Sequence, residues 1–194
     1  MIGTIEDAII ARIRAAAGAG QAFGYDLAAV ASYGGELDDP RTAQQAANKV
    51  PAVWVAFKGE RPPVEAGGGW RYRPTFPAVI ATRHMRNERA ARHGGAGEVG
   101  AYQILRDVRA VLAWQSLGLE IAPLQPGAIQ TLYAAGPAAR LQLTAYALDL
   151  STEYQAEPVV DVEQLDDFAT FHADWDVPPL GNVSAPLPAT DADA

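Results

Sequence analysis

Six arginines between positions 83 and 109 are the side chains best suited to specific recognition. Four recur at every third position and two more follow with the same spacing: Arg83, Arg86, Arg89, Arg92, Arg106 and Arg109. A guanidinium forms planar, bidentate hydrogen bonds with carboxylates and phosphates. On a helix or turn, this spacing predicts a band that contacts carboxylates of a neighbouring subunit or DNA phosphates. The alternative is a solvated face paired with nearby acids, namely Glu88, Glu98 and Asp107.

The segment from Arg83 to His93, which includes Asn87 and Glu88, is expected in a loop-to-helix region at a contact with another subunit or with a second protein. Acidic residues in the carboxy-terminal part of the chain are candidate partners for its arginines. Within one molecule that pairing neutralises the band. Between molecules it joins two unlike surfaces, which builds a head-to-tail ring.

A metal site is the next chemistry that the spacing allows. His84 and Glu88 are four residues apart, so they share a face if the segment is helical. A metal ion needs at least a third ligand, which His93 or Asp107 would have to supply from elsewhere. A solvated, salt-bridged turn is the preferred interpretation. The metal hypothesis implies a divalent-cation-dependent nuclease, whose DNA cleavage Glu88→Gln would abolish.

Signatures of covalent catalysis and of phosphate-binding loops are missing from the sequence. The chain has no cysteine, and none of its serines stands in a G-x-S-x-G elbow. The glycines at 67–69 and 94–97 are not followed by the Lys-Ser/Thr of a phosphate loop. The sequence therefore favours a non-enzymatic protein without a cofactor or a bound metal.

The charge of the 194-residue chain is divided unevenly. All 15 Lys and Arg residues lie at or before Arg140, whereas 11 of the 23 acids follow it. The net charge of −8 disfavours a protein that wraps nucleic acid. The sequence offers no apolar run long enough to span a membrane, and its start lacks the features of a signal peptide, so neither a membrane protein nor secretion is expected.

Helices are predicted in three places. Thr4 resembles an N-cap, and apolar residues at three- and four-residue spacing continue the first helix to about Gly18. Residues 42–48 follow a turn at 38–40 and predict a short helix. Residues 101–114 predict the longest amphipathic helix, with Tyr102 on its apolar face.

Strands are predicted at 28–33, 51–57, 70–82, 129–134 and 141–151, the third interrupted at Pro74 and Pro77 or carrying an edge bulge. The Gly- and Pro-rich segment 61–69 is expected to be flexible, and Gly136-Pro137 to form a turn. Turns that define the fold are expected at 33–37 and 117–127. Alternation in 141–151 predicts two distinct strand faces. The expected core residues are Trp54, Tyr102, Val108, Leu112, Leu143 and Ala145.

This order of elements predicts an α+β fold, with an antiparallel or mixed β-sheet and helices packed mainly on one face. Residues 1–152 form the predicted domain. Residues 153–194 form an acidic, Pro-containing extension that is expected to be partly docked and partly flexible.

Five segments appear in an order that resembles a known family: YGGEL at 33–37, PAVWVAF at 51–57, ATRHMRNERAARHGG at 81–95, GAYQILRDVRAVL at 100–112 and LGLEIAPLQPG at 117–127. The family is that of small virion proteins of Mu-like phages and prophages, encoded between the head genes and the tail-sheath gene. The resemblance covers residues 1–152 and has no counterpart for the acidic extension.

The resemblance implies a tail terminator of a contractile tail. Such a protein forms a homo-oligomeric ring, commonly a hexamer, that closes the tail tube and sheath beneath the head. The implied partners are tube, sheath and neck or head-completion proteins, in a virion assembled in the host cytoplasm. DNA passes through the ring without sequence-specific contacts, and an acidic channel would let it slide. The alternative from another class is a neck or head-completion adaptor that contacts the portal or DNA.

Overall fold

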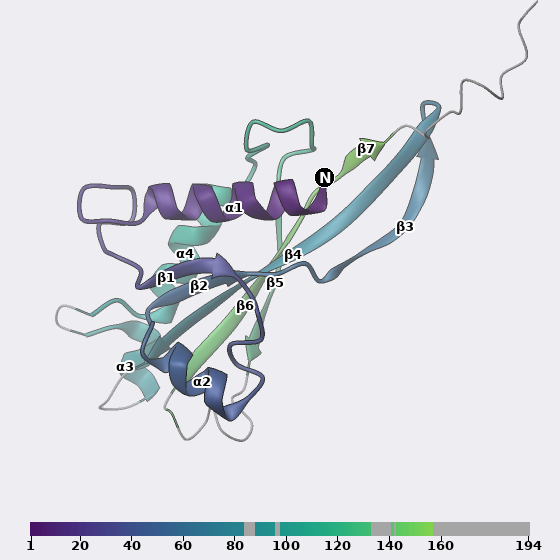
Figure 1. Ribbon diagram of the computed structural model, residues 1–194. Helices are drawn as coiled ribbons and strands as arrows, with labels where there is room; N and C mark the ends of the chain where they lie inside the picture. The colour runs from purple at the N-terminus through teal and green to yellow at the C-terminus, as the bar shows by residue number, and fades with distance from the viewer. Residues whose placement is uncertain (84–87, 96–97, 133–140, 142, 157–194) are drawn as a thin grey trace, which may run out of the picture. The chain divides into compact units, whose positions relative to one another are not determined.

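A mixed β-sheet forms the centre of the protein (Figure 1). The computed structural model describes residues 1–83, 88–95, 98–132, 141 and 143–156. In chain order, its elements are α1 (Ile2–Ala16), β1 (Ala29–Ser32), α2 (Pro40–Ala47), β2 (Ala52–Val55), β3 (Gly59–Ala66), β4 (Gly69–Arg83), α3 (Glu88–His93), α4 (Ala101–Leu112), β5 (Gln125–Leu132), β6 (Leu143–Ser151) and β7 (Tyr154–Ala156). None of the described helices is long and apolar enough to cross a membrane.

The main sheet has the strand order β1-β2-β4-β6-β5. β1 is parallel to β2, and the other pairs are antiparallel, so the predicted α+β class with a mixed sheet is confirmed. The 15-residue strand β4 organises the sheet: its second half pairs with β2 and β6, and its first half pairs with β3 and β7.

Two apolar clusters, one on each face of the sheet, hold the helices. Ile5, Ile9 and Ile13 of α1 are fully buried together with Ile104 and Val108 of α4, against one sheet face. Full burial of such a side chain contributes about 1.5–3 kcal/mol. The second, smaller cluster lies on the opposite face beneath α2 and consists mostly of alanines. Helices therefore cover mainly one face, as predicted.

Strand β6 separates the two clusters as its alternation predicts. Leu148 and Leu150 pack with α1 and α4, while Ala145 and Ala147 belong to the opposite cluster. Five of the six predicted core residues are buried, but Tyr102 is 42% exposed. Its position in the core was wrong because the buried stripe of α4 follows Ala101, Ile104, Leu105, Val108 and Leu112, and Tyr102 lies about 100° away from Ala101.

The segment predicted to be flexible, 61–69, instead forms most of a β-hairpin. β3 pairs with β4 across a turn in which Gly67 and Gly68 have φ of +61° and +82°. Two successive residues of positive φ are typical of the type I′ hairpin turn, which glycine adopts without steric cost. Figure 1 shows this hairpin extending beyond the helices, with β7 beside it. We refer to residues 59–75 as the arm.

β4 runs through Pro74 and Pro77 without the predicted interruption. The backbone of Pro77 faces residues 56–58, between the end of β2 and the start of β3, and its carbonyl accepts from Ala56 N at 3.1 Å. The backbone of Pro74 faces the gap between β6 and β7, where Thr152 N donates to it at 3.3 Å. Each proline therefore lies where the neighbouring strand is itself broken, and no ladder hydrogen bond is lost.

Several element boundaries differ from the predicted ones. α1 begins after Met1 rather than Thr4, because Ile2 also packs against the core. α2 begins at Pro40, where the side chain of Asp39 accepts from Arg41 N at 2.8 Å and caps the helix. β5 starts at Gln125, inside the segment predicted to be a turn. The predicted Gly136-Pro137 turn lies outside the described residues.

Candidate interaction surface

The predicted arginines lie on three elements around the junction of α3 and α4. Arg83 is the last residue of β4, Arg89 and Arg92 belong to α3, and Arg106 and Arg109 belong to α4. The sixth arginine of the band, Arg86, lies outside the described residues, as do the predicted interface residue Asn87 and His84. Glu88 is the first residue of α3, and its side chain is not described. The loop-to-helix placement of the whole segment stays a prediction, since residues 84–87 lie outside the described ranges.

Close backbone contacts fix α3 against the sheet and α4. The buried hydroxyl of Thr82 on β4 donates to the carbonyl of Ala91 on α3 at 2.8 Å. Gly94 follows α3 with φ +83°, and Gly100 is the N-cap of α4. A Cβ added to Gly100 would lie 2.2 Å from Gly94 N and 2.4 Å from the carbonyl carbon of His93. The two helices meet there with no room for a side chain.

Aromatic side chains pack together between this helix junction and the protein surface. The His93 ring meets the Tyr102 ring edge-on with centroids 5.1 Å apart. The Tyr146 hydroxyl donates to the Tyr102 hydroxyl at 3.4 Å, and Arg92 also hydrogen-bonds Tyr146. Arg92 is therefore held by the sheet, whereas Arg89 on the same helix is exposed.

Alkaline titration of Tyr146 is expected to weaken the fold. Burial and the hydrogen bond with Tyr102 raise the pKa of Tyr146 from 10.0 to about 12, although Arg92 opposes the shift. Because the folded state holds this proton more tightly, its stabilising contribution is complete below pH 10 and is lost as the pH rises to about 12. Urea unfolding between pH 9 and 12 should show a shallower loss of stability for Tyr146→Phe than for the wild type. Equal slopes would contradict the assignment.

The exposed side of α4 carries the remaining arginines. Tyr102, Arg106 and Arg109 are exposed and follow one helical stripe about 10 Å long. Arg106 Nε lies 2.8 Å from Asp107 Oδ1, and the Tyr25 hydroxyl donates to Asp107 Oδ2 at 3.1 Å. The hydrogen bond with Asp107 raises the pKa of Arg106, and burial followed by the charge of Asp107 raises that of Tyr25. The alternative of local pairing thus holds for Arg106.

We call this region the basic-aromatic surface and define it as Arg89, Arg92, His93, Tyr102, Arg106 and Arg109. Its guanidinium groups suit carboxylates or phosphates, and its exposed ring offers a stacking face. Within the described ranges, no three His, Asp or Glu side chains are close enough to hold a metal ion. The nuclease hypothesis depends on His84, which lies outside those ranges, and it stays a prediction.

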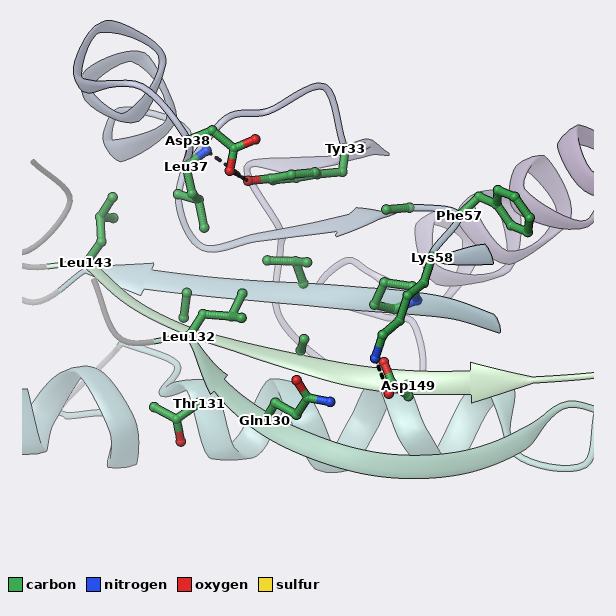
Figure 2. Close-up of a pocket in the computed structure, with 15 residues that line it drawn as sticks. Tyr33, Leu37, Asp38, Phe57, Lys58, Gln130, Thr131, Leu132, Leu143 and Asp149 are labelled. Atoms are coloured by element: carbon green, nitrogen blue, oxygen red, sulfur yellow. Dashed lines mark hydrogen bonds and ion pairs between the residues drawn. The ribbon is translucent and has the colours of Figure 1, made fainter. Parts of the chain in front are cut away.

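A groove of about 630 Å³ lies on the other side of the sheet (Figure 2). Its floor is apolar and made of small side chains, including Val79 of β4 and Ala145 and Ala147 of β6. One wall is the loop after β1, with Tyr33, and the other is the carboxy-terminal end of β5. The floor is hollow because alanines fill little volume above the strands.

Polar groups define the rim of this groove. The Tyr33 hydroxyl donates to Asp38 Oδ1 at 3.0 Å and accepts from Leu37 N at 3.2 Å, which stabilises the predicted 33–37 turn. At the other end, Lys58 Nζ lies 2.9 Å from Asp149 Oδ2, an interaction drawn in Figure 2. Asp149 Oδ1 is buried and has no hydrogen-bond partner among the described residues. The exposed part of this carboxylate, on the Oδ2 side, faces the rim of the groove.

Residues 1–155 match the family model described as Bacteriophage Mu, Gp37. The chain belongs to the bacteriophage Mu Gp37 family. The match covers the whole described sheet except the last residue of β7, so the fold described above is that of this Gp37-family chain. The expected membership of a Mu-like phage family is confirmed, and this membership supports a role as a phage structural protein. No curated protein matches the sequence.

Sequence reasoning about this Gp37-family protein missed both the groove and the arm. The groove is lined by residues that range from Tyr33 to Asp149 in the sequence. No local sequence pattern predicts that residues so far apart along the chain line one groove. The arm did have a signal, because Gly67-Gly68 separates two segments that pair as a hairpin. Pro62 and Pro63 obscured it, although an edge strand tolerates proline.

Proposed function

We propose that this Gp37-family protein is a tail terminator, a structural virion protein that assembles into a ring at the end of a contractile tail. The ring, commonly of six subunits, closes the tail tube and sheath and joins the tail to the head. Its partners are other copies of the chain, tube and sheath proteins, and neck or head-completion proteins. The proposal contains no catalytic step and no cofactor, and it places the chain in the virion after assembly in the host cytoplasm.

The observation that carries this proposal is that one rigid sheet presents unlike surfaces. The basic-aromatic surface lies at the α3–α4 junction, and the groove with its carboxylates lies on the sheet face opposite α1 and α4. Contacts between unlike surfaces are heterologous, and such contacts generate closed rings when the rotation between subunits closes. The arm adds an exposed element that the core does not require.

Net charge is consistent with a ring around passing DNA. The chain carries a net charge of −8, and acidic side chains facing a channel repel phosphate without binding it. The neck-adaptor alternative is favoured by one observation, the basic-aromatic surface, because arginine with an exposed ring also suits DNA phosphates. The two functions differ in what their absence does to a particle.

Removal of the chain from an inducible Mu-like prophage is the decisive test. Loss of a terminator should leave DNA-filled heads and separate tails with tubes of irregular length, visible by negative-stain electron microscopy. Loss of an adaptor should leave tails of normal length and heads that have lost their DNA. Complementation with the wild-type chain should restore joined particles that contain it. Normal particles lacking this polypeptide would overturn both functions.

A further inference from the structure

The arm has two chemically different faces. On β4, Val79 lines the groove and Ile80 packs against α1 and α4, so alternate residues share the groove face. Arg71 and Arg73 fall on that face, and their β3 partners are Val64 and Arg61. The opposite face carries aromatic and acidic side chains, namely Glu60, Glu65, Trp70 and Tyr72.

On the groove face of the arm, some side chains have no close partner among the described residues of the same molecule. Arg73 Nε pairs with Glu153 Oε1 at 2.7 Å, whereas Arg71 Nε is 3.7 Å from the other oxygen. Arg61 is exposed and forms no ion pair with another residue of the described ranges. Val64, directly opposite Arg71, is 55% exposed. Within the described ranges, this face therefore combines the unpaired guanidinium of Arg61 and the distantly paired one of Arg71 with an apolar side chain.

The groove has the complementary chemistry. Its small-residue floor has space for an apolar side chain, and Asp38 and Asp149 outnumber Lys58 on its rim. The Asp149 carboxylate is partly exposed on this rim, and its Oδ2 already faces a cation there, so an arginine of the arm suits this end of the groove. An occupant that brings both a cation and an apolar group satisfies each of these features at once.

The arm cannot fill the groove of its own molecule. β4 is one continuous strand that forms both the arm and, at Val79, part of the groove floor. Arg71 and Val79 are eight residues apart, which is about 26 Å along an extended strand. No loop interrupts this stretch to let the chain fold back.

We infer that the arm of one subunit docks through Val64, Arg61 and Arg71 into the groove of the next subunit. The donor and acceptor surfaces differ, so each copy gives an arm on one side and receives one on the other, which is a heterologous contact. The inference rests on the proposed ring and names the contact that builds it.

Disulfide trapping tests this contact, because the natural chain contains no cysteine. One population carries Val64→Cys and the other Gln130→Cys, because Gln130 pairs with Ala147 on the groove face of the sheet and lies on the groove wall. After mixing and mild oxidation, we expect a covalent dimer that forms only in the mixture, whereas each variant alone stays monomeric on a non-reducing gel. Gln103→Cys, on the exposed side of α4, is the matched control and should not cross-link with Val64→Cys.

A charge variant gives an independent readout. Val64→Asp should weaken self-association at least tenfold by light scattering, while Glu65→Lys on the opposite arm face should leave it unchanged. An oligomer that forms without the mixed disulfide would overturn the docking inference and leave the terminator proposal intact. A chain that stays monomeric at millimolar concentration would also overturn it. Particles that lack the polypeptide would overturn the proposed function instead.

Discussion

Gly100→Ala is expected to lower the free energy of unfolding by about 3 kcal/mol, at the upper end of the usual cost of overpacking. The new methyl group would overlap the backbone at His93 and Gly94, and backbone atoms cannot rotate away as a side chain can. α3 must therefore move away from α4, which separates the His93 and Tyr102 rings. Urea unfolding followed by circular dichroism measures this loss.

Gly3→Ala is the matched control for this substitution. Gly3 lies in the first turn of α1, and a Cβ there meets nothing within 4 Å. Alanine is the better helix former, so we expect a gain of about 0.5 kcal/mol. A Gly100→Ala protein as stable as the wild type would show that the α3–α4 junction is not as close as described.

Phe76→Ala is expected to cost about 3–5 kcal/mol, the range for deleting a buried aromatic side chain. Phe76 is fully buried where the arm joins the rest of β4, and its ring centroid is 5.7 Å from that of Phe57. The cavity would lie in the larger apolar cluster, against which α1 and α4 pack. Thermal unfolding should show a correspondingly lower midpoint.

Trp70→Ala provides the comparison on the same strand face. Trp70 is six residues before Phe76 and is 42% exposed, so its loss should cost clearly less than that of the fully buried Phe76. Equal destabilisation by the two variants would mean that the arm is part of the folding core. A much smaller loss of stability for Trp70→Ala would show that substitutions in the arm leave the folded core intact. Their effects on self-association could then be read without a folding defect.

Local periodicity predicted the elements whose burial is regular. Alternation in β6 assigned Ala145 and Leu148 to opposite faces, and both are buried there. The helical spacing of α4 identified Val108 and Leu112 as core residues. The same spacing wrongly placed Tyr102 in the core. A sequence pattern treats every aromatic residue as apolar and cannot tell whether another element packs over its ring.

The uninterrupted course of β4 escaped prediction because its two internal prolines are tolerated only through long-range geometry. Pro74 and Pro77 are acceptable in a central strand since the neighbouring strands break beside them. The residues that face these prolines are far away in the sequence. Those facing Pro77 are more than 15 residues away, and the one facing Pro74 is more than 70 residues away. Of the predicted interface, the arginine positions were visible in the sequence, while the groove required the folded sheet.

The continuity of β4 has a mechanical consequence. Hydrogen bonds in antiparallel ladders run perpendicular to the strands, so a pull on the arm along β4 loads the bonds to β2 and β6 in shear. Bonds loaded in shear resist together, whereas bonds at a peeled edge break one after another. Force applied at the hairpin tip is thus spread over the width of the sheet, which would let the proposed arm contact carry load without unzipping the sheet strand by strand.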